Sequence, residues 1–116
     1  MQEFFKEQSK CIQVYIGQEV IQDPYEKNVE TTLFDPIYLR AITEDLIASQ
    51  ISWKLPGVKT SRAKRVFIEK FHRNTIELSQ KFVIDGEEYE GWRENGRMQI
   101  REVGDLLELF IYSKHT

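Results

Sequence analysis

The chain has 116 residues, a length that fits one domain with a modest core and leaves no room for a second domain. With 41% hydrophobic and 30% charged residues it is too apolar for a disordered chain and too charged for a membrane protein. No apolar run approaches the roughly 20 residues that span a bilayer, and residues 1–10 lack the apolar stretch of a secretory signal. The single cysteine, Cys11, excludes an internal disulfide and a zinc site with paired thiols, so we expect it to be a small buried hydrophobe.

The net charge of −3 is distributed unevenly along the chain. Residues 1–53 carry −5, residues 54–83 carry +6 and residues 84–116 carry −4. A basic middle between acidic ends could attract DNA, dock an acidic neighbour or be solvated without a partner. The negative total argues against a dedicated nucleic-acid binder, which would usually be basic overall.

Short stretches of apolar alternation separated by turn residues predict a mainly β fold. We expect residues 1–116 to form one small antiparallel β-barrel or sandwich with one short helical turn and a long loop. Residues 1–10, with Phe4 and Phe5, are either a frayed terminus or a flexible arm that becomes ordered only against a neighbour.

The first strands follow from the positions of turn residues. Residues 11–22 are predicted to form a tight hairpin with its turn at residues 17–18, where glycine is followed by glutamine. After a loop over residues 23–28, the chain is predicted to return as a strand over residues 29–34. The first part of residues 37–47 is predicted to be another strand.

Residues 49–61 form the longest predicted loop, and loops of this length in compact domains are often functional. Its apolar side chains are unusual for a segment that should face water, so they either fold back over the core or meet a partner. The residues assigned to this channel or partner loop are Ile51, Trp53, Lys54, Leu55, Pro56, Gly57 and Lys59.

The middle of the chain combines one strand and one helical turn. Residues 62–71 can be drawn as a helix, but the alternation of Val66 and Ile68 against Phe67 favours a strand. Residues 74–79 begin with asparagine and carry glutamate three positions later, a capping pattern that predicts a single helical turn, the only helix of note.

The last third is predicted to be a four-stranded meander over residues 81–84, 87–92, 97–101 and 106–112. Asp-Gly and Asn-Gly at its first two turns supply the positive φ angles that two-residue hairpins need. The side chains expected on the inner faces are Met98, Ile100, Leu107, Leu109 and Ile111.

The sequence offers no catalytic, cofactor or metal constellation. His72 and His115 have no ligand partners at metal-binding spacing, and the glycines are scattered singly at turns. The basic segment over residues 59–73 contains Phe67 and Phe71, so contact with nucleic acid is an alternative to a solvated or protein-binding face. We therefore expect a protein that is not an enzyme, binds no cofactor or metal, and works by docking to other subunits.

A resemblance covers most of the chain from about Val14 onward. The run Lys-Phe-Val-Ile-Asp-Gly-Glu-Glu-Tyr-Glu-Gly-Trp-Arg-Glu-Asn-Gly-Arg-Met-Gln-Ile-Arg over residues 81–101 is its clearest part. Residues 38–43, the loop at 53–57 and the segment 72–79 add to it. The pattern resembles the small head-tail connector proteins of long-tailed bacteriophages, also called head-closure, neck or stopper proteins.

The resemblance implies a β-barrel subunit that assembles as a ring, commonly of twelve copies, made in the host cytoplasm and built into the virion neck. Its implied neighbours are a portal-side adaptor and tail proteins, with passing contact to phage DNA and no membrane. It also implies that a long loop, here residues 49–61, closes the DNA channel. A tail-completion protein of similar build and a β-barrel that binds single-stranded nucleic acid are the alternatives.

A ring needs one patch that meets a different patch on the next copy. Because opposite charges fix register and partner choice, we expect bases of one copy to face acids of its neighbour. The residues predicted for this interface are Arg62, Lys64, Arg65, Glu87, Glu88 and Glu90.

Overall fold

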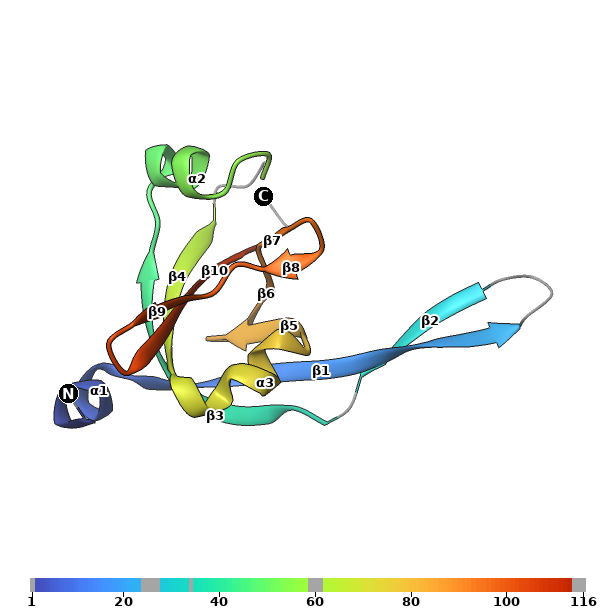
Figure 1. Cartoon of the computed structure of the whole chain (residues 1–116), viewed down its shortest axis with the longest axis horizontal. Helices are drawn as coiled ribbons and strands as arrows, with labels where there is room; N and C mark the ends of the chain where they lie inside the picture. Colours follow the sequence, from blue (N-terminus) through green and yellow to red (C-terminus); the bar gives the residue numbers. More distant parts are fainter. Residues whose placement is uncertain (1, 24–27, 34, 59–61, 114–116) are drawn as a thin grey trace.

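The structure, a computed structural model, describes residues 2–23, 28–33, 35–58 and 62–113, with the backbone alone for residues 2–4, 18–23 and 28–33. It is mainly β, as predicted, and six antiparallel strands close into a barrel (Figure 1). Around the barrel each strand pairs with the next, and the last pairs with the first. In that order the strands are β1 (Lys10–Asp23), β3 (Ile37–Asp45), β4 (Ala63–Glu69), β10 (Leu106–Tyr112), β6 (Glu87–Gly91) and β5 (Ser79–Ile84).

The barrel interior is filled by the apolar residues that alternate along these strands. The predicted inner face of the last strand is confirmed, because Leu107, Leu109 and Ile111 are all fully buried. Met98 and Ile100 are partly buried and pack against the same core, also as predicted. Phe82 is the largest fully buried side chain of this core.

The predicted hairpin over residues 11–22 is wrong. β1 runs unbroken through Gly17, which is paired with Leu33 of β2 (Asn28–Leu33), and the pairing continues to Asp23 opposite Asn28. β2 confirms the predicted returning strand, except for residue 34, which lies outside the described residues. The ribbon of β1 and β2 projects beyond the barrel (Figure 1) and stretches the molecule to 53 × 30 × 26 Å.

The prediction of a long loop over residues 49–61 is also partly wrong, because the first half of this segment belongs to the helix α2 (Ala48–Lys54). Ile51 and Leu55 are one helical turn apart and both are buried, while the Gln50 side chain accepts a hydrogen bond of 3.0 Å from the Ile47 N–H at the start of the helix. This amphipathic spacing is the signal that the loop interpretation missed.

Two further helices are present, so the turn predicted at residues 74–79 is not the only helix. Residues 2–8 form α1 (Gln2–Gln8), and the predicted helical turn is present as α3 (Arg73–Glu77), directly after the 3₁₀ turn η1 (Lys70–His72). The cap prediction at Asn74 is wrong, since the helix begins one residue earlier and His72 at its N-cap makes no side-chain hydrogen bond. Among the described helices none is long and apolar enough to cross a membrane.

The last third is not a simple meander. A separate hairpin, β7 (Arg93–Glu94) with β8 (Arg97–Met98), interrupts it, and β9 (Arg101–Val103) pairs with β10. The predicted third strand is split between β8 and β9, and β10, the predicted fourth strand, lies between β4 and β6 in the barrel wall. The turn residues are as predicted, with φ of 53° at Asp85 and 55° at Asn95.

Candidate functional site

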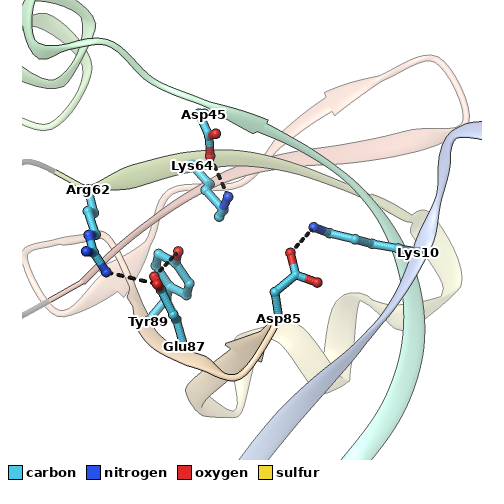
Figure 2. A network of polar contacts seen from close by, with 7 residues as sticks. All are labelled: Lys10, Asp45, Arg62, Lys64, Asp85, Glu87 and Tyr89. Atoms are coloured by element: carbon cyan, nitrogen blue, oxygen red, sulfur yellow. Dashed lines mark hydrogen bonds and ion pairs between the residues drawn. The ribbon is translucent and has the colours of Figure 1, made fainter.

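One end of the barrel opens into a cleft of about 400 Å³. Its floor is apolar, with Leu46, Ala63 and Ile84, whereas its rim is charged. Mouths of β-barrels are among the usual positions of binding sites in proteins. Figure 2 shows the polar residues at this mouth: Lys10, Asp45, Arg62, Lys64, Asp85, Glu87 and Tyr89.

Strand alternation brings these polar residues to the mouth. Lys64 lies two positions before the buried Val66 on β4, and Lys10 lies two positions before the buried Ile12 on β1. Residues two apart on a strand share a face, so the inward face of each strand changes from apolar to charged where the barrel ends. The ammonium group of Lys64 consequently lies 5.8 Å from the centroid of the Tyr89 ring.

Three ion pairs connect different strands across the mouth (Figure 2). Lys10 Nζ lies 2.6 Å from Asp85 Oδ2, which joins β1 to the β5–β6 turn. Arg62 Nη1 lies 2.9 Å from Glu87 Oε1, and Lys64 pairs with Asp45 between β4 and β3.

Two of these groups have displaced pKa values. The hydrogen bond and the charge of Lys10 hold the pKa of Asp85 below its ordinary value of 3.8, so this carboxylate is ionised at neutral pH. Burial, followed by the nearby Glu87 carboxylate, raises the pKa of Tyr89 from 10.0 to about 12. Tyr89 therefore keeps its proton, and its hydroxyl donates a hydrogen bond of 3.0 Å to Glu87 Oε2.

These charges compensate one another within the chain. Each cation has a carboxylate partner, and the pairs connect β1, β3, β4 and β6 around the rim. The arrangement can fix the shape of the barrel mouth. Within the described parts of the chain, no group of three His, Cys, Asp or Glu side chains is placed to hold a metal ion.

The six residues predicted for an interface between copies also have partners within the chain. Arg65 lies 3.5 Å from both Glu44 and Glu108. Glu88 pairs with Lys81 at 3.3 Å, and Glu90 accepts a hydrogen bond of 3.3 Å from the Tyr112 hydroxyl. Pairing between copies remains a prediction, but it would have to compete with these internal partners.

The residues of the predicted loop divide into two groups. Ile51 and Leu55 fold back onto a small second core with Leu46 and Ala63, which answers the question left open by the sequence for these two side chains. The other described members are exposed: Trp53, Lys54, Pro56 and Gly57. Lys59 lies outside the described residues.

Two predictions about the first residues need correction. Phe5, assigned to a flexible arm for a neighbour, belongs to α1 and is buried within the chain, while the side chain of Phe4 lies outside the described residues. Cys11 was expected to be buried but is exposed. It has the opposite strand parity to the buried Ile12 and Val14, and that parity was readable from the sequence.

Sequence reasoning missed most of the mouth residues, namely Lys10, Asp45, Asp85 and Tyr89. The available signal was a charged residue two positions before the first inward-facing apolar residue of a strand, because such a residue faces the same side. Lys10 stands in this position before Ile12. Comparisons with known proteins add no family to this description, because no family model and no curated protein matches the chain.

Proposed function

We propose that this chain is a structural assembly subunit, a ring-forming connector of the phage neck that joins the DNA-filled head to the tail. The single observation that carries the proposal is Trp53, whose side chain is 85% exposed on a helix at one end of the barrel. Tryptophan is enriched among the residues that dominate binding energy at protein interfaces, because it buries a large rigid surface on docking.

The distribution of charge supports a docking role. The charges at the barrel mouth are paired with one another, so the rim is nearly neutral. Partner binding would therefore depend on exposed apolar side chains beside a firm scaffold. Rigid barrels that present such side chains lose little conformational freedom on assembly.

The position of Trp53 favours partner binding over channel closure as the role of residues 49–61. Its helix, α2, lies on the small second core, which holds it against the barrel while Trp53 faces outward. A held helix is better suited to contact with a neighbouring subunit than to a channel gate that must move. We therefore assign the exposed face of α2 to partner binding in the connector.

The test is the assembly state of the purified protein, alone and mixed with candidate portal-side and tail partners. We expect closed rings in negative-stain images and by native mass spectrometry, and expect Trp53→Ala to reduce ring formation or partner binding. Gln99→Ala, a change at an exposed residue between β8 and β9, is the control and should assemble normally. A monomer at every concentration that never binds those partners would contradict the proposal.

The same samples test the alternative that the barrel binds single-stranded nucleic acid. A barrel that binds single strands should retain oligonucleotides with an affinity that falls steeply as salt rises. Phe67 and Phe71, the aromatic pair behind that alternative, do not share a strand face: Phe67 is on β4 and partly buried, whereas Phe71 lies in η1.

A further inference from the structure

Five large apolar side chains are exposed in the described residues, and they gather at two opposite ends of the barrel. The first group, the α2 patch, consists of Ile47 and Trp53. The second group, the α3 patch, consists of Tyr38, Phe71 and Leu78.

Strand register places the two patches apart. β3 and β4 are antiparallel, and Ala41 lies opposite Ile68. Tyr38 comes three residues before Ala41 and Phe71 three residues after Ile68, so both lie toward the same end of the barrel. Ile47 follows the other end of β3, and a nine-residue strand spans about 26 Å at ~3.3 Å per residue. Figure 1 shows α2 and α3 on opposite sides of the barrel accordingly.

The α3 patch is built by one short segment. Phe71 and Leu78 are seven residues apart across η1 and α3, a spacing that returns to the same side of a helical segment. Phe71 is 75% exposed, and its ring lies against the His72 ring at a tilt of 43°, with ring centroids 4.0 Å apart.

We infer that the α2 patch of one copy docks on the α3 patch of the next copy. The two patches differ, so their contact is heterologous, and repetition of a heterologous contact gives a ring when the rotation closes. This inference rests on the proposed function, in which copies of the chain form a ring. It adds the residues on both sides of the contact.

The charges beside both patches allow this contact. Near the α3 patch, Lys70 and Arg73 are paired with Glu102 at 3.5 and 3.3 Å, and Arg73 is also paired with Glu77 at 3.3 Å. Near the α2 patch, Asp45 is paired with Lys64. Neither surface carries an excess of one sign among these residues, so the two patches can approach without strong repulsion.

The exposed area predicts the strength of the contact. An aromatic side chain buries about 150–250 Å², so the five side chains at their observed exposures offer roughly 700 Å² in total. Stable interfaces bury about 1,200–2,000 Å². One contact alone should therefore be weak, and assembly should depend on high concentration, ring closure or a neighbouring ring that aligns the copies.

Cysteine cross-linking tests the pairing directly. Cys11→Ser removes the exposed native thiol, and Ser52→Cys, next to Trp53 on α2, and Asn74→Cys, on α3 beside the α3 patch, are then introduced into separate proteins of different mass, so that both apolar patches stay intact. A mixture treated with a short thiol cross-linker should give the mixed dimer far above either homodimer. Glu88→Cys is the matched control, because this exposed residue lies on β6, across the barrel from β3.

The outcomes are decisive for the inference. A mixed dimer no more abundant than those formed with Glu88→Cys overturns it, and a dominant Ser52→Cys homodimer overturns it in favour of a symmetric contact. Independently, Trp53→Ala should weaken self-association about 30-fold in sedimentation experiments, as expected for an interface hot spot.

The experiments distinguish failure of the contact between the α2 and α3 patches from failure of the proposed function. Rings that form normally with Trp53→Ala and Phe71→Ala would retain the connector role and reject this contact. A clear mixed cross-link in a protein that forms no closed ring and binds no neck partner would retain the contact and reject the role.

Discussion

Replacement of Glu108 should destabilise the barrel more than replacement of any other outward-facing acid tested beside it. Glu108 faces the outer side of β10, yet its side chain is only 10% exposed because it lies between two arginines. Arg65 Nε and Arg101 Nε each lie 3.5 Å from one of its carboxylate oxygens. Arg65 Nε is buried and makes no hydrogen bond, so the Glu108 carboxylate at 3.5 Å is the nearby charge that compensates it.

The magnitude follows from the exposure of the two arginines. Arg101 is 74% exposed, so its pair should contribute about 0–0.5 kcal/mol. Arg65 is 21% exposed, and loss of Glu108 would leave its Nε without a neighbouring anion, although Glu44 remains 3.5 Å from Nη1. Removal of one partner costs about 3–5 kcal/mol in fully buried pairs, and here Arg65 keeps some exposure and a second carboxylate, so we expect about 2 kcal/mol for Glu108→Gln.

Urea denaturation of the single and double variants measures each coupling free energy. The cycle of Glu108→Gln with Arg65→Met should give about 1–2 kcal/mol, and the cycle with Arg101→Met should give less than about 0.5 kcal/mol. Glu88→Gln is the control, since its pair with Lys81 is exposed and its loss should stay within about 0.5 kcal/mol. Equal coupling to the two arginines, or a Glu108→Gln cost no larger than that of Glu88→Gln, would refute the reasoning.

Three further outcomes are expected. Leu109→Ala should lower the free energy of unfolding by about 2–5 kcal/mol in urea denaturation, because it opens a cavity at a fully buried position. Ultraviolet titration should place ionisation of Tyr89 near its pKa of about 12. Because this pKa is raised on folding, the associated stability is present below pH 10.0 and is lost as pH rises towards 12. Tyr89→Phe should abolish that loss. The pKa of Asp85 is lowered on folding, so the stability from its pair with Lys10 is present above pH 3.8 and lost as pH falls below it; acid denaturation of Asp85→Asn should lack this component.

Local chemistry explains which parts of the fold were predictable. The Asp-Gly and Asn-Gly turns need positive φ angles, and those angles occur at Asp85 and Asn95. The burial of alternate residues on the last strand likewise depends on the strand alone. Gly17 shows the limit, because glycine permits a turn but does not require one, and pairing with Leu33 keeps β1 extended.

The mouth could not be predicted from local patterns. Lys10 and Asp85 are 75 positions apart in the sequence, and Arg62 and Glu87 are 25 apart. Which acid meets which base depends on the order of strands around the barrel, where β10 lies between β4 and β6. The sequence-based expectation that these charges would meet across copies followed from charge sign alone, and sign does not distinguish a partner within the chain from one in a neighbour.

Closure of the barrel determines where a partner can bind. In the closed ring of six strands the backbone donors and acceptors are largely used within the barrel, so strand addition is available chiefly on the projecting ribbon of β1 and β2. Elsewhere a partner must contact side chains, and the mouth charges are already paired. The connections at the two ends of the barrel remain, and they carry Trp53 on α2 and Phe71 on η1. A contact between two ends, rather than between two edges, joins different surfaces, and repetition of such a contact gives a ring when the rotation between copies closes and a filament when it does not.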